Sequence, residues 1–367
     1  MTPARPLVAL SLNAGANAGR ARSRARLVRE LLALGGVDVV EVAGATPQES
    51  VAKARAALAP TAGPDAAVAL PRRPGTTTPV PSALVVAGGD GAVHVGLQAV
   101  AGTPVPLGIV PIGSGNDIAR EFGMTAGGVR GAVGAILHAL RAPGAAAVGG
   151  RGATQGHLIE VDAVEVTRPA AHQGAQGTQG APGTSNTPDA PTEHVAWYAA
   201  ILSAGVDAAV NARTNALSWP PGGARYVRAL AEELRHLQPY GYRITLDGVT
   251  QERTALLVAV ANTRFLGGGM RMAPHARTDD GRLDVVLVDP VSRATLARVF
   301  PRIYRGTHTT FHAVHTYRAR EVTLEHAPGL GARPPTAMAD GEPIAPLPLT
   351  MTVRPGALRV VARRVRA

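Results

Sequence analysis

Two short apolar runs in the first third of the chain each lead into a glycine-rich loop. The run Ala83–Ala87 precedes Gly88-Gly89-Asp90-Gly91, and the run Ile109–Ile112 precedes Gly113-Ser114-Gly115-Asn116-Asp117. A helical segment follows each loop. Continuous apolar strands that alternate with helices predict a parallel sheet covered on both faces. Because ligands bind at the carboxyl ends of such strands, we expect both loops to face one crevice.

The N-terminal residues continue this alternation. We predict strands at Leu7–Leu12 and Val37–Val42, a helix over Ala21–Leu34, and a second helix that Thr46 caps and that ends near Leu58. Residues 60–82 contain six prolines and show no periodicity, so they predict a flexible insertion before the third strand.

The pattern changes near residue 157 to short alternating strands, which predicts an antiparallel second domain. A boundary near 145–156 divides a first domain, residues 1–150, from a β-rich domain, residues 151–357, and we expect 358–367 to complete the first domain. The tract 169–192 has almost no apolar residues and predicts a second flexible insertion. The expected strands are Leu158–Val166, Trp197–Ser203, Tyr242–Leu246, Ala255–Ala261, Leu283–Val288, Glu321–Leu324 and Leu349–Val353.

Composition excludes several kinds of chemistry. The chain has no cysteine, which removes disulfides, thiolate nucleophiles and cysteine-ligated metals. The apolar stretch Val195–Val210 is interrupted by Gly205 and Asp207, so it falls short of the roughly 20 apolar residues that a membrane-spanning helix needs. The N-terminal apolar run is too short for a secretory signal. We therefore expect a cytoplasmic protein that is not integral to the membrane.

The net charge of +11 raises the question of nucleic-acid binding. Lys53 is the only lysine, the arginines are scattered, and aromatic residues make up only 3%, so the stacking residues of a single-strand binder are missing. We expect no nucleic-acid partner. A basic patch on this protein would suit an anionic membrane surface instead.

The loop around Asp90 suits a phosphate ligand. Glycines let the backbone approach a phosphate closely, and the N–H groups at the start of the following helix form an anion site. An aspartate beside phosphates needs a bridging cation such as Mg²⁺. The alternative is an ordinary strand-to-helix turn with Asp90 as the N-cap. The loops match neither a Walker A motif nor a dinucleotide fingerprint.

Four segments resemble, in order, the motifs of the diacylglycerol kinase catalytic family. They are GGDGA at 88–92, PIGSGNDIAR at 111–120, NTRFLGGGMRMAPHARTDDGRLDV at 262–285 and ADGEPI at 339–344. The resemblance covers nearly the whole chain outside the two insertions. It implies a Rossmann-like nucleotide domain followed by a β-rich antiparallel sandwich, with ATP and Mg²⁺ in the cleft between them.

The resemblance also implies site residues. Two departures from the family pattern, Ala92 for a threonine and Val95 for a glutamate, remove a hydroxyl and a carboxylate from the first loop. In the N-terminal loop, 13–19, the family's proline is absent and the spacing differs. The residues expected at the nucleotide are Asn13, Thr46, Gly88, Gly89, Asp90, Gly91, Ala92, Val93, His94, Val95, Ser114, Asn116 and Asp117.

Asp340-Gly341-Glu342 resembles the family's DGE segment, in which a carboxylate takes the proton from the lipid hydroxyl. The resemblance makes Asp340, Glu342 and Asp90 the catalytic candidates and does not decide which member of the DGE pair is the base. A plain surface turn is the alternative.

Asp280, with backbone oxygens of Arg277 and Arg282, resembles a structural Mg²⁺ site, for which an Asx turn is the alternative. Asp162 and Asp207 match further family aspartates, and both also suit turns. His308, His312 and His315 are spaced to align on a helix, yet no carboxylate stands at ligand spacing, so we expect no zinc site.

The resemblance predicts an ATP-dependent kinase that phosphorylates a lipid hydroxyl, bound peripherally to the inner face of the membrane, with a homodimer as a further expectation. An NAD kinase is the nearest alternative, and the GSGND loop and the DGE segment disfavour it. A third hypothesis is a nucleotide-binding regulatory protein that has lost catalysis. The departures at Ala92 and Val95 favour it. Retention of the acidic residues Asp90, Asp117, Asp340 and Glu342 argues against it.

Overall fold

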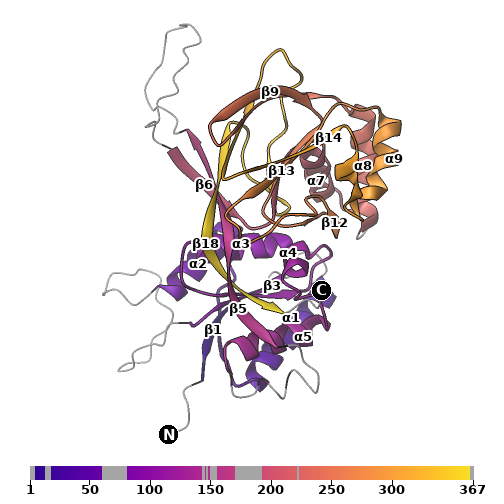
Figure 1. Ribbon diagram of the computed structural model, residues 1–367. Helices are drawn as coiled ribbons and strands as arrows, with labels where there is room; N and C mark the ends of the chain where they lie inside the picture. Colours follow the sequence, from indigo (N-terminus) through magenta and orange to yellow (C-terminus); the bar gives the residue numbers. More distant parts are fainter. Residues whose placement is uncertain are drawn as a thin grey trace.

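The computed structural model describes residues 5–12, 18–59, 81–142, 145, 148, 155–169, 192–220 and 223–363 (Figure 1). Except at their edges, the two predicted insertions lie outside these residues, as does Asn13.

The first domain is built on four parallel strands in the order β2-β1-β3-β4. Strand β3 is buried along its whole length, as its continuous apolar sequence requires. Helices α2 and α3 pack together on one face of the sheet, and α1 and α5 pack together on the other (Figure 1). The elements are β1 (Leu7–Leu12), α1 (Ala18–Leu34), β2 (Asp38–Glu41), α2 (Pro47–Leu58), β3 (Leu84–Gly88), α3 (Asp90–Val100), β4 (Leu107–Pro111), α4 (Asp117–Glu121) and α5 (Gly128–Ala139).

Two long strands connect the domains. Strand β18 (Leu349–Arg363) lies parallel to β4 through Val360 and Leu107, and it pairs antiparallel with β5 (Gly156–Pro169). Both strands run from the first domain into the second (Figure 1). The predicted short strands Leu158–Val166 and Leu349–Val353 were therefore wrong in length, since each forms one part of a strand that continues into the other domain.

The second domain is a sandwich of two sheets. One is the upper part of the long sheet, with β6 (Thr192–Tyr198), β8 (Tyr240–Leu246), β9 (Val249–Ala255) and β15 (Glu321–His326). The other sheet has antiparallel neighbours throughout, and a core that includes Tyr198, Tyr242, Val258 and Leu349 fills the space between the two. Its strands are β7 (Ile201–Gly205), β10 (Leu257–Ala261), β13 (Leu283–Val288), β14 (Val314–Ala319), β16 (Met338–Ala339) and β17 (Glu342–Pro343). The expected fold, a Rossmann-like parallel-sheet domain followed by an antiparallel sandwich, is confirmed.

The predicted strand Trp197–Ser203 is wrong as a single element. It divides at Ala199 and Ala200 into β6 and β7, which belong to different sheets. The backbone N–H groups of these two alanines donate to the carboxylate of Asp340 instead of to a neighbouring strand. An alternating pattern of side chains does not reveal such a bend.

Three helices and two 3₁₀ turns flank the second sheet, and none of them was predicted. They are α7 (Val206–Ala216), α8 (Gly223–Glu233), η1 (Leu234–His236), α9 (Arg293–Ile303) and η2 (Thr307–Thr310), and a small hairpin of β11 (Phe265–Leu266) and β12 (Met270–Arg271) lies below them. In the described part of the chain, every helix is too short or too polar to cross a membrane.

Candidate functional site

The two glycine-rich loops touch each other. The N–H of Ile112 donates to the carbonyl of Gly88 at 3.0 Å, which brings the ends of β3 and β4 together. A Cβ atom added to Gly113 would overlap the Cα of Gly89, so the backbones are too close for a side chain at that position. The loops therefore form one surface at the carboxyl edge of the parallel sheet.

Asp90 links the two loops. It is the first residue of α3, and Gly89 holds the N-cap position, so the alternative of Asp90 as the N-cap is wrong. Its Oδ1 accepts a hydrogen bond from the N–H of Ile118 at 3.1 Å. Burial, together with the neighbouring carboxylates of Asp117 and Asp340, raises the pKa of Asp90 to about 7.

Asp117 links the first domain to the second. Its Oδ2 accepts the N–H of Gly268 at 2.6 Å, and the Nε of Arg120 lies 3.6 Å from Oδ1. Gly268 stands in a run of three glycines that all have positive φ, a conformation that presents the backbone to Asp117. Burial raises the pKa of Asp117. Its Oδ1 is buried and has no hydrogen-bond partner among the described residues.

Asp340 is held tightly at the turn between β16 and β17. Its Oδ1 accepts the N–H of Ala200 at 2.9 Å, and its Oδ2 accepts the N–H of Ala199 at 3.1 Å. The Nδ1 of His94 lies 3.2 Å from the same Oδ2. Because both oxygens are engaged and the residue is buried, Asp340 is suited to positioning the turn.

Glu342 presents a free carboxylate to the first loop. A Cβ atom added to Gly91 would overlap the Oε1 of Glu342, so the two ends of the chain meet here. Within the described residues the Glu342 carboxylate makes no hydrogen bond or ion pair. Burial, and to a lesser degree the nearby Asp340, raises the pKa of Glu342, while His94 opposes this shift.

Asp90 and Asp117 fit a magnesium ion. In the residues that the structure describes, no three His, Asp or Glu side chains converge to hold a metal by themselves. Mg²⁺ in phosphoryl-transfer sites is held by one or two carboxylates together with substrate phosphates. The unpartnered Oδ1 of Asp117 and the mutual repulsion with Asp90 are what a bound cation would relieve.

Two other residues that were expected to contact the nucleotide use their polar side chains in hydrogen bonds to nearby backbone groups. The hydroxyl of Thr46 caps α2, as predicted, by accepting the N–H of Glu49 at 3.1 Å. The side chain of Asn116 folds back onto Gly113 through two hydrogen bonds, whereas Ser114 is exposed.

Three further residues that were expected at the nucleotide lie on α3 and have apolar side chains, which cannot hydrogen-bond to a ligand. Ala92 and Val93 pack in the core, and Val95 is half-buried. The backbone N–H of Val93 is also engaged, because it donates to the carbonyl of Gly89 at 3.1 Å.

The proposed structural metal site has a different set of contacts. The Oδ1 of Asp280 accepts the N–H of Arg282 at 3.1 Å, which is an Asx turn, and its Oδ2 pairs with Arg318. Arg277 pairs with Asp279 at 3.2 Å. Magnesium binding at Asp280 stays a prediction, and it would have to displace the guanidinium of Arg318.

The three histidines do not lie on one helix. His308 belongs to η2 and contacts the carbonyl of Met272 at 3.1 Å, and His315 belongs to β14 and pairs with Asp289 at 2.6 Å. The spacing that would have aligned them on a helix was thus misleading.

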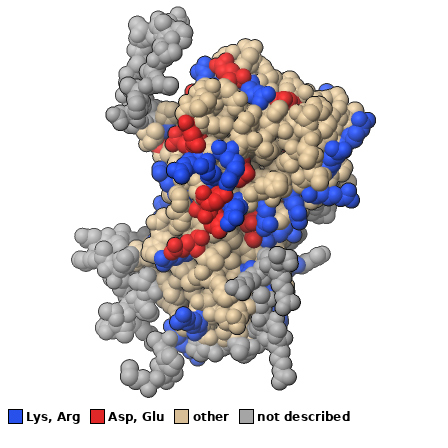
Figure 2. All heavy atoms as spheres, in the orientation of Figure 1, with Lys and Arg blue, Asp and Glu red and all other residues tan. Residues whose placement is uncertain are grey.

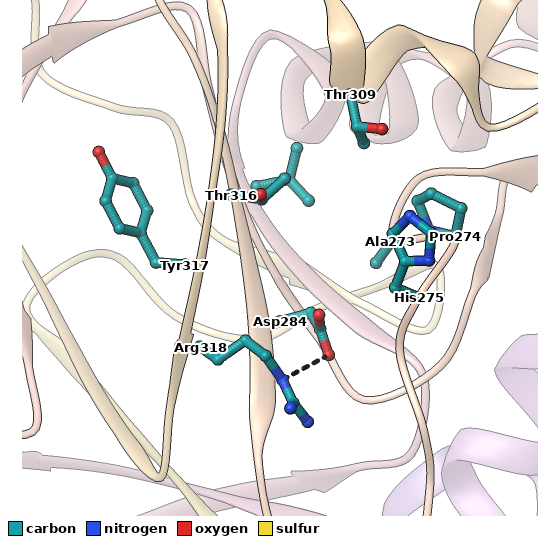
Figure 3. Close-up of a pocket in the computed structure, with 9 residues that line it drawn as sticks. Ala273, Pro274, His275, Asp284, Thr309, Thr316, Tyr317 and Arg318 are labelled. Carbon is teal, nitrogen blue, oxygen red and sulfur yellow. Dashed lines mark ion pairs between the residues drawn. The ribbon is translucent and has the colours of Figure 1, made fainter.

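A cavity of about 320 Å³ lies elsewhere in the second domain (Figure 3). Arg318 and Asp284 face each other inside it at 3.9 Å, and Thr309, Thr316 and His275 line it further. It shares no lining residue with Asp90, Asp117, Asp340 and Glu342, which we call the acidic cluster. Its charges neutralise each other, so we assign the chemistry to the cluster.

Sequence reasoning missed two connections that assemble the cluster. It placed His94 near the nucleotide and did not foresee its contact with Asp340, and it gave the glycine run at 267–269 no role. His94 is a polar residue among the apolar side chains of a helix that follows a phosphate loop. That imidazole, buried on a phosphate-loop helix, was the available signal.

Comparison with known proteins agrees with the fold and the motifs. The model of the diacylglycerol kinase catalytic domain matches residues 8–145, and that of the YegS C-terminal NAD kinase beta sandwich-like domain matches residues 200–362. A diacylglycerol kinase of Mycobacterium tuberculosis is 33% identical over 90% of this chain and 86% of its own length.

Two further relatives are more distant. A probable lipid kinase YegS-like protein of Stenotrophomonas maltophilia is 30% identical over 45% of this chain and 52% of its own length. A crystal structure of a diacylglycerol kinase from Bacillus anthracis has the same fold, with a TM-score of 0.59, 15% identity, and coverage of 99% of this chain and 98% of the other. Together with the two domain models, the mycobacterial relative shows that the chain belongs to the diacylglycerol kinase family.

Proposed function

We propose that this protein transfers the γ-phosphate of ATP to the hydroxyl of a lipid, diacylglycerol or a related lipid alcohol. The observation that carries the proposal is the position of Glu342, whose free carboxylate lies against Gly91 of the phosphate loop. A base placed beside the phosphate donor is what the attack of an alcohol on phosphorus requires.

The chain's own groups account for the steps. Backbone N–H groups at Gly89 and Gly91, at the start of α3, hold the phosphates. Glu342 accepts the proton of the lipid hydroxyl as that oxygen bonds to the γ-phosphorus. The bond from the γ-phosphorus to the bridging oxygen breaks, and ADP leaves with that oxygen. Asp340 keeps the turn in place through its hydrogen bonds with the N–H groups of Ala199 and Ala200.

Magnesium would be held by Asp90 and Asp117, whose carboxylates border the same loop surface. When bound, it neutralises charge on the phosphate oxygens. Arg120, at 3.6 Å from Asp117, balances part of the negative charge of this pair.

Glu342 is better suited than Asp340 to be the base. Asp340 accepts two backbone hydrogen bonds and contacts His94, so its oxygens are already engaged. The pKa of Glu342 is raised by burial, which makes it a stronger proton acceptor than an exposed glutamate.

Labelled ATP tests the proposal directly. Purified protein is incubated with γ-labelled ATP, Mg²⁺, NAD and mixed micelles that contain diacylglycerol, a sphingoid base, phosphatidylglycerol or an isoprenoid alcohol, with Asp90→Ala as the inactive control. We expect label in one of the lipids with the wild-type protein alone. Label in NAD but in no lipid would favour an NAD kinase, and label in neither would favour a nucleotide-binding protein without catalysis.

A further inference from the structure

Helices α8 and α9 lie side by side at one edge of the second domain (Figure 1). The side chain of Arg293, at the start of α9, donates to the carbonyl of Arg235 in η1 at 2.6 Å, which ties the two helices together. The sequence between Asp289 and Glu321 contains α9 and has no acidic residue. The α9 side of this edge is therefore cationic, whereas Glu232 and Glu233 of α8 pair with Arg228 and Arg213.

Three arginines of this edge are free. Arg298, Arg302 and Arg305 are exposed, and within the described residues none of them makes an ion pair. Figure 2 shows blue side chains gathered along the edge that α8 and α9 form. By contrast, most other arginines of the second domain face a carboxylate, as Arg243 faces Glu252 at 2.7 Å.

Large apolar side chains are exposed on, or next to, the same two helices. Trp219 is 69% exposed, Val227 of α8 is 64% exposed, and Tyr304, which follows α9, is 50% exposed. Exposed aromatic rings beside arginines are typical of residues that sit at the boundary between water and lipid. We call this set, Trp219, Val227, Arg298, Arg302, Tyr304 and Arg305, the α8/α9 face.

The α8/α9 face adjoins the acidic cluster. Tyr304 lies close enough to Tyr226 of α8 to contribute to the raised pKa of that phenol. The ring of Tyr226 lies 3.8 Å from the place a Cβ would take on Gly267, and the next residue, Gly268, donates to Asp117. Tyr226 and the glycine run thus lie between this face and Asp117.

We propose that the α8/α9 face docks on an anionic bilayer, an inference that rests on the proposed lipid kinase function. Charge complementarity selects this partner, because unpaired arginines attract anionic lipid headgroups while the exposed rings enter the interface. An arginine near such a surface strengthens binding about fivefold. Docking in this orientation presents the glycine run and Asp117 to the membrane.

Vesicle sedimentation tests the docking without requiring catalysis. The full chain is mixed with phosphatidylcholine vesicles, with or without 30% phosphatidylglycerol (roughly the charge density of an anionic leaflet). We expect binding to need phosphatidylglycerol and to fall with salt. Arg298→Gln with Arg302→Gln should weaken binding to the phosphatidylglycerol vesicles about 25-fold, and Trp219→Ser with Tyr304→Ser should also weaken it.

The matched control is Arg130→Gln with Arg333→Gln, two exposed arginines outside the face that make no ion pair with a described residue. It removes the same charge and should bind as wild type does. Equal binding of both double variants, or no dependence on phosphatidylglycerol, overturns the proposal. A wild-type dimer that Arg298→Gln with Arg302→Gln dissociates, without a change in vesicle binding, would make the face a contact between two copies and also overturn it.

A micelle assay separates this proposal from the function. In neutral detergent micelles, the Arg298→Gln with Arg302→Gln variant should phosphorylate lipid at the wild-type rate, since it lacks only the attraction to the bilayer. If no variant phosphorylates lipid but vesicle binding still depends on these arginines, the kinase proposal fails and the docking surface stands.

Discussion

The Nδ1 of His94 lies 3.2 Å from the Oδ2 of Asp340, and this contact joins the phosphate-loop helix to the DGE turn. Both side chains are buried. Gln98, one turn further along α3, lies 3.4 Å from the other ring nitrogen and exchanges hydrogen bonds with the backbone of Trp197 at 2.7 and 2.9 Å. The imidazole is therefore fixed from both sides, and Asp340 with it.

Removal of the imidazole should lower turnover while leaving ATP binding intact. His94→Ala removes a hydrogen bond to a buried carboxylate, a loss of about 1.5 to 3 kcal/mol, so we expect a fall in kcat of roughly 10- to 100-fold. The KM for ATP should change little, because the side chain faces Asp340. Steady-state kinetics on the preferred lipid measures both constants.

His94→Asn is the matched control, since its amide nitrogen can occupy nearly the place of Nδ1. It should recover most of the lost turnover. Equal loss in the two variants would mean that the volume of the ring, not its hydrogen bond, positions Asp340.

The two acidic residues of the DGE turn should respond differently to loss of charge. Glu342→Gln keeps the shape of a side chain that is free of partners, so we expect the fold to be unchanged and kcat to fall roughly 10²- to 10⁴-fold. Asp340→Asn places an amide against the N–H groups of Ala199 and Ala200, so we expect a loss of stability as well. Thermal unfolding beside kinetics separates the effects. Near-normal turnover in Glu342→Gln would remove it as the base.

A methyl group on Gly91 should block the site. Gly91→Ala favours the helix by about 1 kcal/mol in isolation, yet its Cβ would overlap the carboxylate of Glu342. We therefore expect activity to fall sharply with little loss of stability. Glu342→Asp, which is one methylene shorter, should restore part of the activity when combined with Gly91→Ala. A double variant no better than Gly91→Ala alone would show that the two side chains do not compete for this space.

The parallel sheet and its two loops could be predicted because their signal is local. Each apolar run ends in its own glycine-rich loop, and parallel strands bring those ends to one edge. The length of β18 could not be predicted in this way. Arg354-Pro355-Gly356 resembles a turn that ends a strand, but the chain continues through a bulge between Arg354 and Leu358. The N–H of Gly356 there donates to Asp162 at 3.1 Å, a contact across 194 residues.

The features of the site that could not be predicted are contacts between residues far apart in the sequence. Asp340 and His94 are 246 residues apart, and nothing in either local pattern indicates the other. Asp162 suited a turn, but it accepts hydrogen bonds from Gly281 and Gly356 and so joins three segments of the second domain. Motifs thus supplied the candidate groups, whereas the pairings between them depend on how the two domains pack.

Asp207 should make the stability of the protein depend on pH. Both of its carboxylate oxygens are buried at the start of α7 and lack a hydrogen-bond partner of normal geometry in the described residues. Burial raises its pKa from 3.8 to about 7, although Ser203 partly opposes the shift. Between these values the folded state keeps a proton that the unfolded chain has released. Stability therefore falls as pH rises from about 4 to 7 and stays reduced above 7.

Asp207→Asn removes this titration and keeps the shape of the side chain. We expect the variant to exceed the wild type in free energy of unfolding at pH 8 by about 4 kcal/mol, and to differ little near pH 4. Urea unfolding at several pH values measures the difference. Asp38→Asn, a change at an exposed carboxylate, is the control and should show no such trend. A difference between Asp207→Asn and wild type that is constant from pH 4 to 8 would mean that Asp207 ionises normally, and that its burial is relieved by a partner such as water.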